Sequence, residues 1–145
     1  MSLACTLLIA GCGGNQGEKP QPVDTSMFTE VKKASKTAEK QHPGESVYKA
    51  YCATCHQPNG KGVPGMYPPL TPNVYIENKD SVIYVVLTGM QGKIEVNGEI
   101  YNNFMAPHGH LSDRELAEVI SYVRSSFGNN LDPVTAEEVA SARKK

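Results

Sequence analysis

The sequence predicts an all-α fold with one small β-hairpin, and two observations lead to this prediction. Ser112 to Glu115 form a capping box, which opens a helix with a single apolar stripe made of Leu116, Val119, Ile120, Val123 and Phe127. Asn97-Gly98 stands between alternating apolar residues, which favours a type I′ turn and a hairpin over residues 94–101. The chain shows no internal repeat.

Length and composition limit the size of the fold. The 145 residues suffice for one domain with attached segments. A hydrophobic share of 39%, with 13 glycines and 10 prolines, indicates a small core and much loop. The formal net charge of −1 argues against a nucleic-acid partner and gives no electrostatic steering toward any other.

Residues 1–12 are expected to be a separate segment. An apolar run ends in Ile9-Ala10-Gly11-Cys12, and polar sequence follows at once. This resembles the end of a bacterial lipoprotein signal peptide, which implies lipidation of Cys12 and loss of Cys5 on processing. The run is too short to span a bilayer, and no Lys or Arg precedes it as in a complete signal. The alternatives are an ordinary export signal or a fortuitous apolar start.

Residues 13–43 predict a flexible tether. Residues 13–22 have too little apolar surface to fold alone. Residues 27–41 favour a polar helix, and we expect its lysines to form a solvated face rather than a lipid- or partner-binding one. A spacer of about 30 residues would let an anchored domain move over tens of ångströms.

The folded domain is predicted to start at Gly44. Residues 45–53 favour a helix that turns Val47, Tyr48 and Tyr51 toward a core. A glycine-rich loop over residues 60–65 and a stiff, proline-containing segment over 66–70 follow.

Three helices are predicted beyond this point. Asp80 is expected to cap a helix that reaches about Leu87 and ends at Gly89. Gly128 ends the long helix that follows Ser112. Thr135 to Glu138 form a second capping box, which opens a short helix in a C-terminal extension over residues 129–145.

Cys52-Ala53-Thr54-Cys55-His56 is the pattern of a c-type haem attachment site. Thiols at this spacing can form thioethers with the two vinyl groups on one edge of a porphyrin, which leaves His56 beneath the iron. The alternatives are half of a four-ligand zinc site and a thioredoxin-like redox pair. The other cysteines lie in the N-terminal segment and no βαβ pattern follows, so we favour one covalent haem c, which would also supply an apolar centre.

Residues on both sides of this motif match a known family. Gly44, Tyr48 and Cys52 have the spacing of its N-terminal helix, and residues 119–123 match its C-terminal helix. Residues 68–70 match its proximal loop, and residues 102–107 its axial methionine loop. Over about residues 44–128 the chain thus resembles the class I cytochromes c, and in particular the bacterial subgroup that is found as electron-transfer modules of respiratory complexes and periplasmic dehydrogenases.

The resemblance implies a class I cytochrome c fold around a covalently bound haem c. It further implies that the first and last long helices cross near a right angle, with the small residue Gly44 at their contact. The backbone carbonyl of Pro68 is expected to accept a hydrogen bond from the Nδ1–H of the proximal ligand, His56. Ligating histidines nearly always have such an acceptor.

The sixth ligand has several candidates. Met1 and Met27 lie outside the domain, Met66 follows the motif too closely, and Met90 ends a helix where it can belong to the core. Met105 lies in a loop about fifty residues after His56 and is the expected ligand; its alternative role is to fill a gap in the core. His108 and His110 would give a bis-His site but are expected to face solvent or bond within the loop, and His42 lies outside the core.

A His/Met-ligated iron has no open position for substrate and a raised reduction potential. We therefore expect no enzyme but a single-electron carrier of a respiratory chain. Transfer is expected to be outer-sphere, through the haem edge near Cys52 and Cys55, with residues 60–65 and 104–109 rimming the docking surface. Candidate donors to the propionates are Tyr75, Lys93, Asn97 and Tyr101.

The expected redox partners are a quinol-oxidising complex or a dehydrogenase as donor and a terminal oxidase as acceptor. The expected location is the periplasm or the outer face of the cytoplasmic membrane, with the chain held by its lipid anchor. Two alternatives remain open at this point. One is a fixed cytochrome subunit of such a complex, and the other is a five-coordinate haem peroxidase or gas sensor.

Overall fold

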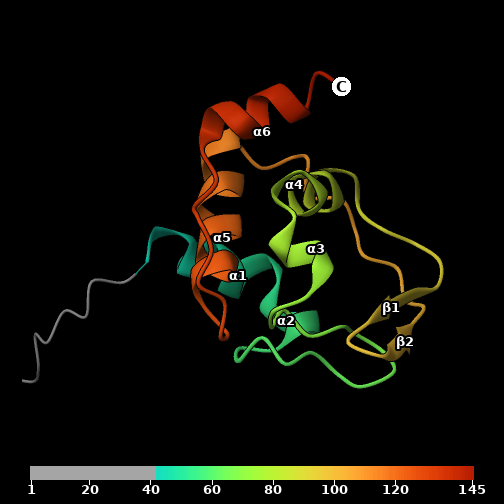
Figure 1. Cartoon of the computed structure of the whole chain (residues 1–145). Coiled ribbons are helices and arrows are strands. Elements are labelled where there is room, and N and C mark those ends of the chain that lie inside the picture. Colours follow the sequence, from blue (N-terminus) through green and yellow to red (C-terminus); the bar gives the residue numbers. More distant parts are fainter. Residues whose placement is uncertain (1–41) are drawn as a thin grey trace, which may run out of the picture. The chain divides into compact units, whose positions relative to one another are not determined.

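Helices dominate the part of the chain that the computed structural model describes, residues 42–145 (Figure 1). In chain order the elements are α1 (Pro43–Tyr51), α2 (Ala53–His56), α3 (Val74–Glu77), α4 (Lys79–Thr88), β1 (Ile94–Val96), β2 (Glu99–Tyr101), α5 (Asp113–Ser125) and α6 (Ala136–Ala142). The mostly helical fold with one small hairpin is confirmed. The signal segment with Cys5 and Cys12, and the tether up to residue 41, lie outside the described residues.

Helix α1 begins one residue before the predicted start of the domain. Pro43 occupies its first turn, where a missing N–H costs nothing, and His42 caps it by accepting the backbone N–H of Gly44 at Nδ1 over 3.2 Å. The helix ends at Tyr51 rather than Ala53, because the backbone departs from helical geometry at Cys52 (φ −111°) and resumes as α2. None of the helices within residues 42–145 is both long and apolar enough to cross a membrane.

The contact between α1 and α5 depends on the absence of a side chain at Gly44. A Cβ there would lie 1.9 Å from the backbone oxygen of Glu118, so no other residue permits this approach. The buried ring of Tyr48 continues the contact, with its centroid 5.4 Å from Tyr122 and 5.2 Å from Phe127. Figure 1 shows α1 passing across α5, and this crossing fixes the C-terminal end of α1, where Cys52 follows.

Helix α4 differs from its prediction at its start. Asn78, not Asp80, is the N-cap, and its side-chain oxygen accepts the N–H of Ser81 over 2.9 Å. Asp80 lies in the first turn instead, where a carboxylate interacts favourably with the helix dipole. Gly89 ends the helix with a positive φ of 74°, as predicted.

The four-residue helix α3 has no counterpart among the predicted elements. Asn73 caps it by accepting the N–H groups of Tyr75 and Ile76. The buried guanidinium of Arg124 on α5 closes the other end by donating to the carbonyls of Ile76 and Glu77, the latter over 3.2 Å. A turn this short leaves no periodic pattern in the sequence.

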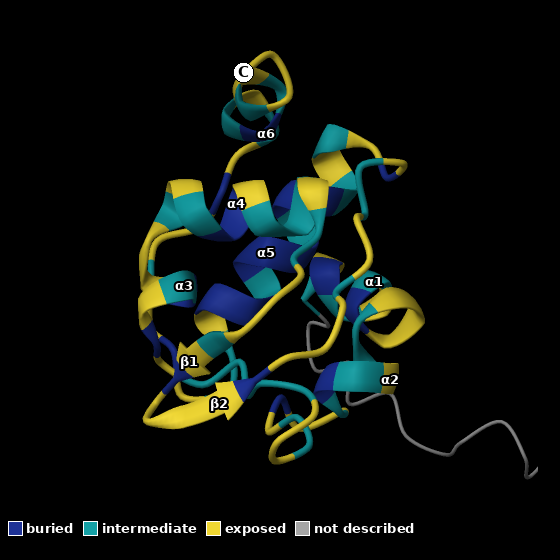
Figure 2. Cartoon of the chain, turned by 90° about the vertical axis from the view of Figure 1, so that its right-hand side faces the viewer, coloured by how far each residue is buried: buried dark blue, intermediate teal, exposed yellow. Residues whose placement is uncertain are grey.

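The hairpin forms as predicted. Ile94 pairs with Tyr101, and the turn residues Asn97 and Gly98 have φ values of 53° and 82°, the positive values that a type I′ turn requires. The buried side chains of Val96 and Tyr101 anchor the hairpin to the domain (Figure 2).

The two predicted capping boxes are both present. Ser112 and Glu115 open α5, and Thr135 and Glu138 open α6. The part of the stripe that lies on α5 forms the centre of the core, visible as the dark helix in Figure 2. The helix ends at Ser125 rather than at Gly128, so Phe127, with a positive φ of 57°, packs against the core from beyond the helix. The segment after Gly128 packs into the same core, because Val134 and Val139 are buried.

Candidate haem site

An apolar crevice opens between α2, the end of α4, the hairpin and the loop before α5. Its main hollow has an empty volume of about 820 Å³, which includes the part that is open to solvent. Two smaller hollows of about 400 and 490 Å³ share walls with it. No Asp, Glu, Lys or Arg lines the main hollow, so an apolar ring system can enter without burying a charge.

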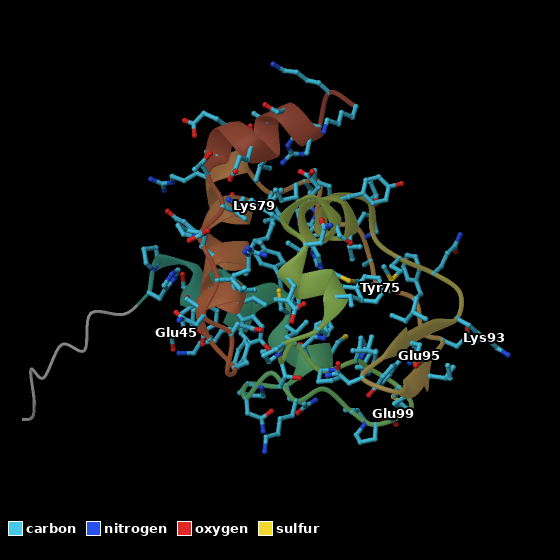
Figure 3. The ribbon with its side chains drawn as sticks, in the orientation of Figure 1. Glu45, Tyr75, Lys79, Lys93, Glu95 and Glu99 are labelled. Atoms are coloured by element: carbon cyan, nitrogen blue, oxygen red, sulfur yellow. The ribbon has the colours of Figure 1, made fainter. Side chains whose placement is uncertain are left out.

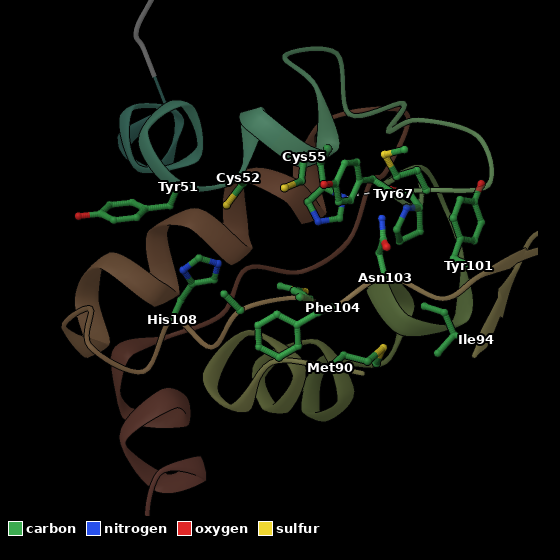
Figure 4. Close-up of a pocket in the computed structure, with 15 residues that line it drawn as sticks. Tyr51, Cys52, Cys55, Tyr67, Met90, Ile94, Tyr101, Asn103, Phe104 and His108 are labelled. Carbon is green, nitrogen blue, oxygen red and sulfur yellow. Dashed lines mark hydrogen bonds between the residues drawn. The ribbon is translucent and has the colours of Figure 1, made fainter. Parts of the chain in front are cut away.

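Cys52 and Cys55 both border the main hollow, and Figure 4 shows their sulfurs directed into it. The break between α1 and α2 places them on one side, because Cys52 caps α2 and Cys55 lies inside it. Both thiols are free. Before haem attachment, burial, with a smaller effect from Cys55, raises the pKa of the Cys52 thiol to about 11, so this thiol is neutral at physiological pH.

His56 ends α2 and is buried in the same wall. Its Nδ1 lies 2.9 Å from the carbonyl oxygen of Pro68, the contact that the family resemblance implies. A carbonyl only accepts, so Nδ1 carries the proton and Nε2 keeps the lone pair that binds metal. Burial lowers the pKa of His56, which the hydrogen bond to Pro68 partly opposes, so the ring is held in the neutral form that ligates.

The loop that carries Pro68 folds closely over α2. Gly62 donates its N–H to the carbonyl of His56 over 2.9 Å. A Cβ at Gly62 would lie 2.2 Å from the oxygen of Tyr67 and 2.6 Å from that of Pro68, so glycine is needed to bring the Pro68 carbonyl to the imidazole.

Met105 enters the crevice from the loop before α5. Its backbone pairs with that of Met90, with N to O distances of 2.8 and 3.0 Å, and His108 donates its N–H to Val86 over 2.9 Å. These bonds tie the loop to the end of α4. Among the residues that line the three hollows, only His56 and Met105 border all of them.

The other two methionines of the domain also reach the crevice. Met90 borders two of the hollows and is only partly buried, so it does not belong to the core proper. Met66 borders only the main hollow and is 47% exposed. Neither of them borders all three hollows, as Met105 does.

The three histidines outside the motif occupy different places. His42 caps α1, and His110 is exposed. His108, predicted to face solvent or bond within the loop, lies partly buried in the crevice wall, and its buried Nδ1 has no partner within residues 42–145. Burial, with smaller effects from His110 and His56, lowers the pKa of His108. Tyr51, predicted to face the core, is 44% exposed at the crevice rim, with its ring centroid 6.1 Å from that of His108.

Two of the four candidate propionate donors reach the crevice. Tyr101 lines the main hollow, and Tyr75 lines an adjoining one on the side of α3 that faces the hairpin (Figure 3). The Tyr101 hydroxyl donates to the Glu99 carboxylate over 2.7 Å, and burial with this contact raises the Tyr101 pKa to about 12.

The other two candidates lie elsewhere. Lys93 points outward before β1 in Figure 3, and Asn97 donates to the carbonyl of Pro72 over 3.3 Å. Sequence reasoning missed Tyr67 and Asn103, which supply further polar groups to the crevice wall. Only their positions beside Pro68 and Met105 hint at this.

The chemistry of the wall fits haem c. It offers two thiols, the His56 imidazole with a free Nε2, methionine thioethers and a mostly apolar surface that carries a few tyrosine, asparagine and histidine groups. By contrast, residues 42–145 contain no group of three or more Cys, His, Asp or Glu side chains that could hold a metal ion directly.

Comparisons with known proteins agree with this chemistry. Residues 41–127 match the Cytochrome c family. The chain is 39% identical over 115 residues to cytochrome c-552 of Thermus thermophilus, a match that covers 72% of this chain and 87% of that protein. It is 31% identical over 103 residues to the cytochrome c subunit of the quinone alcohol dehydrogenase of Gluconobacter oxydans, covering 69% of this chain and 22% of that subunit. It is 33% identical over 118 residues to the fructose dehydrogenase cytochrome subunit of Gluconobacter japonicus, a match that covers 77% of this chain and 24% of that subunit.

Proposed function

The chain belongs to the cytochrome c family and is an electron-transfer protein with covalent haem c, and we propose that it is a single-electron carrier of a respiratory chain with His56 and Met105 as the iron ligands. One observation carries this proposal: His56 and Met105 alone border all three hollows of the crevice. Ligation from both leaves no open position for a substrate.

Each residue of the site has a separate task in this proposal. The haem supplies an iron that gains and loses one electron. Cys52 and Cys55 hold it by two thioether bonds. Pro68 keeps the proton on Nδ1 of His56, which leaves the lone pair of Nε2 free, so that Nε2 would bind the iron. The thioether sulfur of Met105 raises the reduction potential, and the apolar wall keeps water from the site.

Electrons enter and leave at the mouth of the crevice. Its rim carries exposed apolar side chains, with Tyr51 44%, Met66 47% and Phe104 64% exposed. No charged side chain lines the main hollow behind them. Redox partners therefore dock by apolar contact around the mouth. A quinol-oxidising complex or a dehydrogenase is the donor, and a terminal oxidase is the acceptor.

A fixed cytochrome subunit of a dehydrogenase is the second candidate. The similarity to the alcohol and fructose dehydrogenase subunits favours it, although this chain matches only about a quarter of each. The match over 87% of cytochrome c-552 favours the separate carrier.

The carrier works outside the cytoplasm, held to the membrane through acyl chains on Cys12, with residues 13–41 as its tether. The pattern Ile9-Ala10-Gly11-Cys12 supports this part of the proposal. Mass spectrometry of the membrane-bound protein tests it. We expect acyl chains on an N-terminal Cys12 in the wild-type protein. The Cys12→Ala variant should lack them and appear in the soluble fraction. An unmodified Cys12 in the wild-type protein would refute the anchor.

Two matched variants test the ligand assignment. Met105→His keeps a sixth ligand but should abolish the methionine–iron charge-transfer band of the oxidised protein and lower the reduction potential. Met90→Leu removes sulfur with little change in volume and should leave both unchanged. If the band survives in Met105→His and disappears in Met90→Leu, the ligand is Met90 and the assignment is wrong.

A further inference from the structure

We infer that Arg143, which follows α6 near the end of the chain, is a positioning residue that holds the Met105 loop against the crevice. This inference rests on the proposed ligand role of Met105. Arg143 donates from Nη1 to the carbonyl of Gly109 over 2.6 Å, from Nη2 to the carbonyl of Leu111, and from Nε to the Asp113 carboxylate over 2.5 Å. One guanidinium thus bonds three groups within five residues.

The bonded stretch is the continuation of the Met105 loop. Between Met105 and α5 the chain has two sets of tertiary hydrogen bonds. The first set joins Met105 to Met90 and His108 to Val86, on the α4 side. The second is the Arg143 fork, at residues 109–113. Removal of the fork leaves the far end of the loop without its hydrogen bonds to α6.

The fit is specific for arginine. Two backbone carbonyls and one carboxylate converge on its planar fork, whose five N–H donors point in fixed directions. A lysine ammonium keeps the charge but is a single point on a flexible stem, so it cannot reproduce the three bonds together. Gly109 is also packed closely on α4, because a Cβ there would lie 3.1 Å from the oxygen of Leu87. Arg143 therefore bonds a loop that already packs closely against the end of α4.

The contact between Lys79 of α4 and Glu138 of α6 supplies a matched control, because it also holds α6 in place. Glu138 of α6 accepts a bond from Lys79 of α4 over 3.0 Å, and Figure 3 shows Lys79 near α6 and away from the hairpin. Lys79→Gln weakens the docking of α6 without touching residues 105–113. A general loosening of α6 and a specific release of the loop can thus be told apart.

The test compares full-length holoprotein in four forms: wild type, Arg143→Gln, Arg143→Lys and Lys79→Gln. The first readout is the rate at which CO binds the reduced protein, which requires Met105 to leave the iron. The second is amide hydrogen exchange at Met105 and His108. Because charge-assisted hydrogen bonds are lost, the rate of CO binding in Arg143→Gln should be about tenfold higher than in wild type, and the rate in Arg143→Lys should lie between the two. Exchange at both amides should rise in the same order.

Lys79→Gln should match wild type in both readouts even where its unfolding midpoint falls. Equal CO rates in Arg143→Gln and Lys79→Gln would overturn the inference. If Arg143→Gln fails to assemble, a wild-type rate in Arg143→Lys would overturn it equally. The charge-transfer band of the wild type distinguishes a wrong assignment of Met105 from a wrong inference about Arg143. Its absence removes the Met105 assignment and this inference together, whereas its presence with unaltered Arg143 variants removes the inference alone.

Discussion

Replacement of Gly44 by alanine is the sharpest test of the packing that places Cys52. The new Cβ would lie 1.9 Å from the oxygen of Glu118, 2.4 Å from its carbonyl carbon and 2.8 Å from the Cα of Val119. All three are backbone atoms of α5, so no rotamer change relieves the clash. Ordinary contact begins at 3.4 Å, and the difference from 1.9 Å means that α1 must move away by about 1.5 Å.

The cost follows from the contacts that such a shift disturbs. Overpacking of a well-filled contact costs up to about 3 kcal/mol. The contacts of Tyr48 with Tyr122 and Phe127 are pulled apart as well, at about 1 kcal/mol. Alanine recovers about 1 kcal/mol through its better helix propensity. Gly44→Ala should therefore lower the free energy of unfolding by about 3 kcal/mol, which moves the urea midpoint by about 1.5 M at an m-value of about 2 kcal/mol/M.

Urea unfolding of the holoprotein, followed by circular dichroism, measures this change. Ser46→Ala is the matched control, because Ser46 lies on the exposed side of the same helix and should shift the free energy by less than about 0.5 kcal/mol. A Gly44→Ala protein within 0.5 kcal/mol of wild type, with an unchanged m-value, would refute the close approach of α1 and α5.

Two further predictions concern pH and docking. The Thr135 N–H and Lys79 hold the pKa of Glu138 below its ordinary value of 4.5, so Glu138 stabilises the fold above that pH and this contribution disappears as the pH falls through the lowered folded-state value. The Glu138→Gln variant should therefore lose less stability than the wild type between pH 6 and 3, as measured by thermal unfolding. An equal loss in both proteins would contradict the role of Glu138 in the cap of α6. Phe104→Ala should slow reduction by a donor membrane fraction several-fold with an unchanged spectrum, and the wild-type rate should vary little with ionic strength in stopped-flow experiments. A steep fall of that rate with salt would show that charges guide docking.

The elements predicted correctly are those with local causes. In both capping boxes and in the hairpin turn, the interacting residues lie within four positions of each other, so the sequence displays each complete signal. The start of α4 was predicted wrongly because Asn78 and Asp80 are both good caps, and only the backbone geometry distinguishes them. The prediction that Tyr51 faces the core was also wrong, because α1 ends there and its last turn borders the crevice mouth.

Long-range contacts set the limit of sequence reasoning. Arg124 bonds carbonyls 48 and 47 positions away, and Arg143 bonds groups 34, 32 and 30 positions away. Neither residue differs in pattern from a surface arginine. At the site, the motif located Cys52, Cys55 and His56 directly, because covalent attachment fixes their spacing. Tyr67 and Asn103 had no such signal, and their place at the crevice follows only from the folding of their loops.

The proposal claims that the protein supplies both iron ligands, His56 and Met105, so that the site carries electrons and does not bind substrates. The most direct measurement is the addition of CO to the fully reduced wild-type holoprotein at pH 7, combined with a redox titration. We expect a single one-electron transition, a methionine–iron charge-transfer band in the oxidised form and no more than very slow CO binding. Rapid and complete CO binding would show an open position and would contradict the claim.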